Sequence, residues 1–176
     1  GDGDMDVLSA SEGDDTIAWY ENDGSQNFTK IDITTSADAV RSVYAADVDG
    51  DGDMDVLSAS HGDDTIAWYE NDGVENFTKI DITTSADGAW SVYAADVDSD
   101  GDMDVLSASL NDDTIAWYEN DGSQNFTKID ITTSADGPRS VYAVDMDGDG
   151  DMDVLSASRG DNTIAWYEQE GFQPTT

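Results

Sequence analysis

The chain has no cysteine and very few basic residues. Its 176 residues include 6 Lys and Arg against 41 Asp and Glu, so the formal net charge at pH 7 is -35. Without cysteine, neither a disulfide framework nor a thiol nucleophile is possible. Nucleic acid is not expected as a partner, because binding it requires clustered Lys and Arg. Anionic membrane surfaces are disfavoured for the same reason.

Long apolar runs are also missing. None approaches the roughly 18 residues that a membrane-spanning helix needs, so membrane insertion is not expected. His61 is the single histidine and has no counterpart in the other copies, so a histidine-dependent catalytic site is not expected. No signal peptide is visible, and the chain begins inside a repeat, which indicates a mature product or a fragment.

An acidic loop recurs at a fixed spacing of 49 residues. Residues 47–55 read Asp-Val-Asp-Gly-Asp-Gly-Asp-Met-Asp, and close copies occupy 96–104 and 145–153. A truncated copy stands at residues 2–6. Carboxylates at alternate positions around a glycine are what a calcium loop requires, and ligands that are all oxygen favour a hard cation. The pattern therefore predicts calcium loops. The alternative, solvated acidic turns, would explain the acidity of these loops but not the regular spacing of their aspartates.

Other calcium-binding folds fit the chain less well. An EF-hand needs a glutamate at position 12 of its loop and flanking helices. That position holds Ser58, Ser107 or Ser156, and the flanking segments are typical of strands. A nonapeptide β-roll would repeat far more often than every 49 residues.

Four short segments per repeat are typical of β-strands. In the second copy they are 42–48, 55–60, 65–70 and 77–83, each rich in β-branched and aromatic residues and bounded by Gly, Asn and Asp. Period-two alternation in 65–70 predicts that Ile66 and Trp68 face one way and that Ala67 and Tyr69 face the other. A disordered chain is the alternative for such an acidic composition. However, 4 of the 5 Trp and all 7 Tyr recur at the 49-residue spacing. We therefore predict an all-β protein of β-propeller blades, each with four antiparallel strands and a calcium loop between its first and second strands.

These boundaries divide the chain into one repeat array, 1–176. A partial blade at 1–41 lacks its first strand, complete blades follow at 42–90 and 91–139, and a partial blade at 140–176 lacks its last strand. Fourteen strands are expected. Incomplete blades expose unpaired strand edges, which favours self-association or a longer parent chain.

The acidic loop, the following Asp-Val-Leu-Ser-Ala-Ser and the later Thr-Ile-Ala-Trp-Tyr-Glu-Asn-Asp-Gly resemble the FG-GAP/VCBS repeat family. Its members include the β-propeller of integrin α subunits and many bacterial surface and secreted proteins. The resemblance extends to Glu168, but the literal Phe-Gly and Gly-Ala-Pro signatures are absent, so only the bacterial type is implied. It implies a secreted or cell-surface protein that binds about three structural Ca²⁺ ions.

The resemblance also assigns the calcium ligands. Side-chain ligands would be Asp47, Asp49, Asp51, Asp55, Asp96, Asp98, Asp100, Asp104, Asp145, Asp147, Asp149 and Asp153. Backbone carbonyl ligands would be Asp53, Asp102 and Asp151. A partial site, expected to be empty or weak, would hold Asp2, Asp4 and Asp6.

The copies differ from one another mainly at two kinds of loop, which emerge on the same face of a propeller. The candidate ligand-binding residues there are His61, Leu110 and Arg159 in one loop type, and Trp90 and Arg139 in the other. A ligand face on a constant scaffold explains this variation. Neutral drift at exposed loop tips explains it equally.

Three Asn-Phe-Thr segments match the acceptor pattern for N-glycosylation, at Asn27, Asn76 and Asn125. A turn asparagine preceding a strand needs no glycan and is the alternative.

No acidic residue stands apart from the repeat, so no catalytic residue is predicted and the protein is not expected to be an enzyme. The function predicted is a calcium-stabilised extracellular module for adhesion or structural self-assembly. The alternative is a lectin-like carbohydrate-binding propeller or an accessory domain of a polysaccharide-active enzyme, in which Trp90 would stack on a sugar. The possible ligands are a glycan or a protein.

Overall fold

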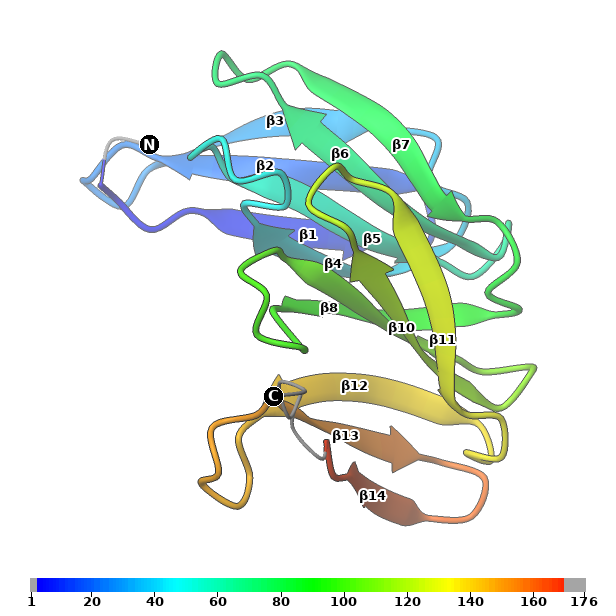
Figure 1. Cartoon of the computed structure of the whole chain (residues 1–176). Helices are drawn as coiled ribbons and strands as arrows, with labels where there is room; N and C mark the ends of the chain where they lie inside the picture. Colours follow the sequence, from blue (N-terminus) through cyan, green and yellow to red (C-terminus); the bar gives the residue numbers. More distant parts are fainter. Residues whose placement is uncertain (1–2, 170–176) are drawn as a thin grey trace.

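The computed structural model describes residues 3–169, which form β-strands and loops without any helix (Figure 1). No segment in this range could therefore cross a membrane as a helix. The all-β class and the fourteen strands expected from sequence are confirmed. The strands are β1 Val7–Ser11, β2 Thr16–Asn22, β3 Phe28–Thr34, β4 Val40–Ala46, β5 Asp55–Ser60, β6 Thr65–Asn71, β7 Phe77–Thr83, β8 Ala89–Ala95, β9 Asp104–Ser109, β10 Thr114–Asn120, β11 Phe126–Thr132, β12 Pro138–Val144, β13 Asp153–Ser158 and β14 Thr163–Tyr167.

The strands form four antiparallel sheets that follow one another along the chain. The first is β1-β2-β3, the second β4-β5-β6-β7, the third β8-β9-β10-β11 and the fourth β12-β13-β14. Within each sheet, strands that are consecutive in sequence pair with each other, as their short connections allow. This arrangement is consistent with propeller-like blades (Figure 1).

The repeat extends to backbone detail. The pairing of β2 with β3 shifts register between Ile17 and Ala18, and the same shift recurs one and two repeats later. A one-residue shift bends a strand and increases its local twist. Near-identical sequences therefore place near-identical bends in successive sheets.

The hydrophobic core lies between the sheets. Ile66 and Trp68 on β6 pack toward the third sheet, whereas Ala67 and Tyr69 pack toward the first. Successive side chains of a strand point to opposite faces, so the two faces of β6 contribute to two different cores. The opposed orientations expected from the alternation of these residues are confirmed.

The first strands of the second, third and fourth sheets lie next to one another (Figure 1). Tyr44, Tyr93 and Tyr142 stand at equivalent positions on β4, β8 and β12, with successive ring centres 4.6 Å apart. Val92 N donates to Ser42 Oγ across the same boundary at 3.4 Å. Contacts between equivalent residues therefore join the sheets.

Two strands of the second sheet differ from the prediction in their bounds. The segment expected at 65–70 extends one residue further, as β6 Thr65–Asn71. The segment expected at 42–48 forms strand β4 over Val40–Ala46, two residues earlier at each end. Val48 N donates to Asp55 Oδ2 at 3.0 Å, so Val48 belongs to the acidic loop rather than to the ladder. Period-two alternation alone cannot locate this change of partner.

Candidate metal centres and the opposite loop face

The acidic loop between β4 and β5 is folded around its first aspartate. Asp47 Oδ1 accepts a hydrogen bond from Gly50 N at 2.9 Å, and Oδ2 accepts one from Gly52 N at 3.0 Å. Gly52 has φ 97°, a left-handed conformation that favours glycine. The glycines therefore allow the backbone to turn tightly enough for alternate aspartates to approach.

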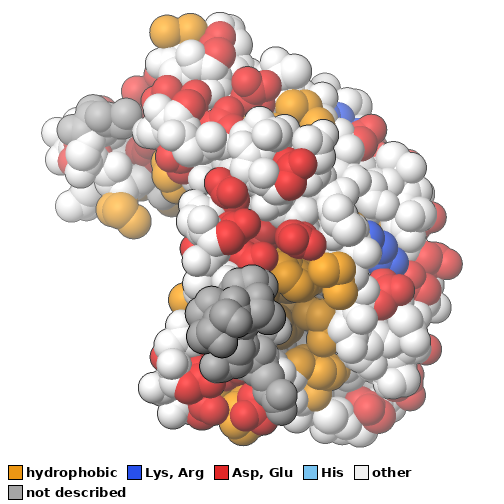
Figure 2. All heavy atoms as spheres, in the orientation of Figure 1, with side chains coloured by type: hydrophobic (Ala, Val, Ile, Leu, Met, Phe, Trp, Pro, Cys, Tyr) orange, Lys and Arg blue, Asp and Glu red, His pale blue; other side chains and the backbone are white. Residues whose placement is uncertain are grey.

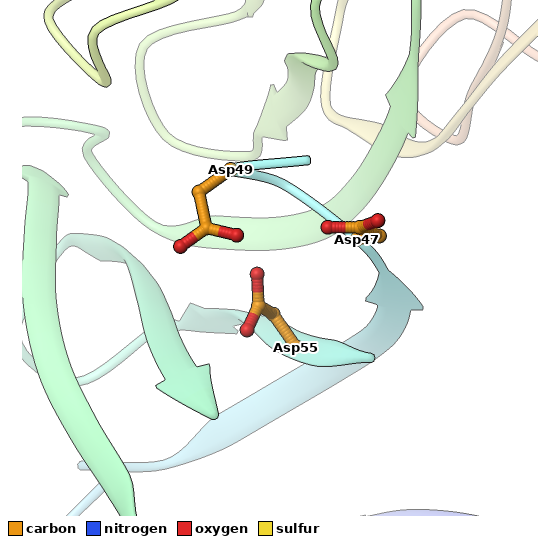
Figure 3. A group of neighbouring side chains, drawn as sticks. All are labelled: Asp47, Asp49 and Asp55. Atoms are coloured by element: carbon orange, nitrogen blue, oxygen red, sulfur yellow. The ribbon is translucent and has the colours of Figure 1, made fainter. Parts of the chain in front are cut away.

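Three carboxylates converge in this loop (Figure 3). Asp47, Asp49 and Asp55 each present one oxygen, and these oxygens all lie within 4.8 Å of one another. Two oxygens bound to one calcium ion at 2.3–2.6 Å can be up to about 5 Å apart, so the spacing fits a single ion. The equivalent clusters in the later repeats are Asp96, Asp98 and Asp104, and Asp145, Asp147 and Asp153.

The fifth and seventh loop positions lie outside these clusters of three. Asp51 Oδ1 accepts a hydrogen bond from Asp53 N at 2.8 Å, which directs this carboxylate to its own loop backbone. Asp100 and Asp149 make the same bond in the later loops. The ligand roles of these aspartates, and the carbonyl roles of Asp53, Asp102 and Asp151, remain predictions.

The last aspartate of the motif is buried and connects three segments. Asp55 has an exposed fraction of 0%, and its oxygens accept amide hydrogens from Val48 at 3.0 Å and Asn71 at 2.8 Å. Burial raises the pKa of Asp55 and raises that of Asp104 to about 6. A neighbouring divalent cation opposes this effect, because it favours the ionised carboxylate.

In the fourth sheet, the pKa of the equivalent aspartate, Asp153, shifts in the opposite direction. The Gln169 N–H donates to Asp153, and this bond holds the pKa of that carboxyl below its ordinary value.

The truncated first copy keeps part of the arrangement. Asp6 Oδ1 accepts a hydrogen bond from Asn22 N at 2.8 Å, as Asp55 does from Asn71. Asp2 lies outside the described residues. Asp4 stands at the position of Asp53 and lies against Gly24.

On the other ends of the strands, three of the candidate ligand-binding residues meet. The Arg139 guanidinium carbon lies 4.1 Å from the centre of the Trp90 ring, and His61 meets that ring edge-on with centres 5.7 Å apart. Arg41 lies 4.4 Å from the Trp90 ring centre. Because β4 and β12 flank β8, the two guanidinium groups cover the indole from either side.

The candidate ligand-binding residues predicted from the sequence did not include Arg41, or Glu12, which pairs with it. Arg41 occupies the position of Trp90 one repeat earlier, and its guanidinium pairs with Glu12. Both stand at the variable positions that define the loop face, so that comparison could have identified them. Leu110 and Arg159 lie beside Arg139 and line a shallow cavity of about 400 Å³ with it.

The three asparagines of the possible glycosylation sites occupy exposed turns before β3, β7 and β11. Asn27 Nδ2 donates to Asp23 at 2.8 Å, and Asn76 Nδ2 donates to Asp72 at the same distance. Asn125 donates to Asp121 at 3.0 and 3.2 Å. Each amide that a glycan would modify thus has a structural role in its turn.

Acidic side chains are spread over the visible face of the molecule, and Lys and Arg are few (Figure 2). Such a surface repels polyanions.

The FG-GAP-like repeat model matches three overlapping segments, residues 1–58, 47–107 and 97–156. The chain belongs to this family. No curated protein sequence matches it.

Several solved structures share the fold, among them a lectin and a lyase. A lectin from Agrocybe aegerita that recognises non-reducing terminal N-acetylglucosamine is 20% identical with a TM-score of 0.56, over 86% of this chain and 47% of its own. A streptogramin B lyase is 12% identical with a TM-score of 0.57, over 97% of this chain and 53% of its own. The chain thus spans about half the length of these proteins. A lectin and a lyase on one fold show that the fold does not decide the function.

Proposed function

We propose that the protein is a calcium-stabilised, non-catalytic β-propeller module of the extracellular type that serves structural assembly or adhesion. The observation that supports it is the convergence of three carboxylates in each acidic loop, with their oxygens within 4.8 Å of one another. Family membership supports the calcium assignment and the secreted or surface location.

Calcium in these loops would act on the fold. Asp55 already connects the end of β6 to the segment after β4 through its two amide hydrogen bonds. An ion held by Asp47, Asp49 and Asp55 would neutralise their mutual repulsion and tie the loop to the buried start of β5. Binding free energy then contributes to the stability of the folded state.

The two end sheets support assembly. Ile164 and Trp166 in the fourth sheet have exposed fractions of 82% and 47%, although Ile66 and Trp68 at the same positions are buried between sheets. On the opposite end of the molecule, Phe28 is half exposed.

These two exposed surfaces carry the two halves of the contact that joins sheets within the chain. A second copy could therefore pack its first sheet on the fourth sheet of its neighbour, in a head-to-tail contact that forms a ring or a fibre.

Carbohydrate binding through Trp90 gains no support from the geometry. A sugar would have to displace Arg41 or Arg139 before it could stack on the indole. The similarity to the lectin extends to the fold alone.

Isothermal titration calorimetry with Ca²⁺ tests the metal assignment. We expect about three ions per chain, and about one fewer in the Asp49→Asn variant. Asp63→Asn removes the same charge from the opposite loop face of the same repeat and should leave the number of bound ions unchanged. No calcium binding by the wild-type chain would contradict the proposal.

Light scattering tests assembly. The wild-type chain should exceed the mass of one copy, and Ile164→Asp should reduce that mass. Thr127→Asp, on the exposed outer strand β11, is the control. A wild-type chain that is monomeric at all concentrations would exclude this contact.

A further inference from the structure

One edge of β1 is unpaired within the described residues. β1 pairs only with β2, whereas its counterparts β5, β9 and β13 each lie between two strands. The consequence is visible in burial: Leu8 and Ser9 on β1 are partly exposed, but Leu57 and Ser58 on β5 have exposed fractions of 0%.

A cavity of about 770 Å³ lies along this edge. Leu8 and Trp19 line it from the first sheet, and Val43, Tyr44 and Ala45 line it from β4 in the second. It is therefore bounded by strands from two sheets, and its lining also includes carboxylates of the acidic loops, among them Asp6, Asp53 and Asp55.

The same space one repeat later is filled by the chain itself. Ala46, at the end of β4, and Val48, just after it, are buried in one cluster with Leu57 and Trp68, the counterparts of two cavity residues. The internal copy shows what fits this space, namely an extended first strand of the repeat.

Two polar groups at the cavity have partners in the later copies that the described residues do not supply here. Asn71 Nδ2 donates to Met54 O, but its counterpart Asn120 also donates to Val48 O at 3.4 Å. Asp6 accepts one amide hydrogen, from Asn22.

Asp55, the counterpart of Asp6 one repeat later, accepts a second amide hydrogen, from Val48 at 3.0 Å. An incoming strand with the sequence of the repeat would provide both missing partners.

Tyr44 extends this pattern to an aromatic group. Tyr93 packs against a tyrosine ring on each side, at 4.6 Å, whereas Tyr44 packs against Tyr93 on one side and faces the cavity with the other. A tyrosine on the incoming strand would complete the row.

We propose that this cavity binds an extended segment of another chain built from the same repeat, with the pattern Ser-Val-Tyr-Ala-Ala-Asp-Val-Asp found at residues 42–49. The segment adds to β1 as a further antiparallel strand, so main-chain bonds give affinity and the tyrosine gives register. This inference rests on the calcium function proposed above in one respect. The aspartates of the segment, which correspond to Asp47 and Asp49, would stand beside Asp6 and complete a fourth metal centre.

A synthetic peptide of residues 42–50, labelled for fluorescence anisotropy, tests the proposal with the whole chain. We expect saturable binding in Ca²⁺ that weakens at least about tenfold in EGTA, because the aspartates then repel Asp6. A Tyr→Ala change in the peptide should weaken binding about tenfold, as expected for a lost aromatic pair. A scrambled peptide should not bind.

Two protein variants provide a matched comparison. Leu8→Asp places a carboxylate in the cavity and should weaken peptide binding at least about tenfold, whereas Thr29→Asp on the exposed strand β3 of the same sheet should not. Because Leu8→Asp can also lower stability, a photo-crosslinker in place of the peptide tyrosine gives a second readout in the wild-type chain. It should label residues that line the cavity.

Absence of peptide binding, or labelling elsewhere, would overturn the proposal. It would also be overturned if the segment raised stability only when fused ahead of residue 1, since the cavity would then belong to a strand of its own chain. Calcium titration without peptide separates the two proposals: about three bound ions with no peptide binding would contradict this inference alone.

Discussion

The Arg139 guanidinium lies over one side of the Trp90 indole, 4.1 Å from the ring centre, and Arg41 lies 4.4 Å from the same centre. The three residues occupy one position of the repeat in three successive copies. Two of the six basic residues of the chain are therefore placed against a single aromatic ring. Divergence between copies has built a contact that no single repeat contains.

We predict that this contact stabilises the stacking of the second, third and fourth sheets. Trp90→Leu keeps an apolar side chain but removes the ring, and should lower the free energy of unfolding by about 1–2 kcal/mol, since each cation–π pair contributes about 0.5–1 kcal/mol at a partly exposed site. Chemical denaturation measures the change.

A double-mutant cycle between Trp90→Leu and Arg139→Met should give a coupling of about 0.5–1 kcal/mol. Arg159→Met, a neighbouring arginine for which no ring contact is found in the described range, is the control and should show no coupling with Trp90→Leu. A zero coupling for Arg139 would mean that the residues are adjacent without an energetic interaction.

Removal of calcium should lower stability sharply. Each ion at a concentration 100 times its dissociation constant contributes about 2.7 kcal/mol, and three such loops are present. Thermal unfolding followed by circular dichroism, in excess Ca²⁺ and then in EGTA, measures the effect. Recovery on adding Ca²⁺ back, but not an equal concentration of Na⁺, separates specific binding from charge screening. An unchanged melting curve in EGTA would rule out a structural role.

Much of the fold could be predicted from the sequence because local signals agree with one another. Alternation predicted that Ile66 and Trp68 face one way and that Ala67 and Tyr69 face the other, and the two pairs do pack in different clusters. The acidic motif predicted convergence, and its first, third and ninth positions do converge.

The remaining features depend on contacts between distant segments. The end of β4 could not be placed because the Val48 amide, two residues after it, donates to a carboxylate seven residues later. The stack around Trp90 could not be foreseen because it requires knowing that three first strands lie side by side. Variation between copies identified the surface but not how its residues meet.

The acidic loop at 96–104 carries a local backbone strain that the loops at 47–55 and 145–153 avoid. Ser99 has φ 64°, while Gly50 and Gly148 at the same position have φ 77° and 83°. A non-glycine residue in this region costs about 1–2 kcal/mol, which the greater freedom of glycine in the unfolded chain partly offsets. Ser99→Gly should therefore raise the free energy of unfolding by about 0.5–1 kcal/mol.

The reciprocal change, Gly50→Ser, should lower the free energy of unfolding by a similar amount. Gly13→Ser is the control, because Gly13 has no left-handed φ and a Cβ added there would meet no atom within 4 Å. Equal effects at Gly13 and Gly50 would mean that backbone conformation is not the cause.

The turn before β7 separates a structural role for its asparagine from a glycosylation role. Asn76 Nδ2 donates to Asp72 at 2.8 Å, and this bond holds the pKa of Asp72 below its ordinary value. In protein made by a host without glycosylation, Asn76→Ala should lower the free energy of unfolding slightly, because the turn loses this solvent-exposed hydrogen bond. Thr78→Val also destroys the acceptor pattern but keeps the amide and a β-branched strand residue, so stability should not change. If both variants were as stable as the wild type, the asparagine would have no structural role in the turn. An increase in the mass of the wild-type protein after expression in glycosylating cells would then indicate that Asn76 carries a glycan.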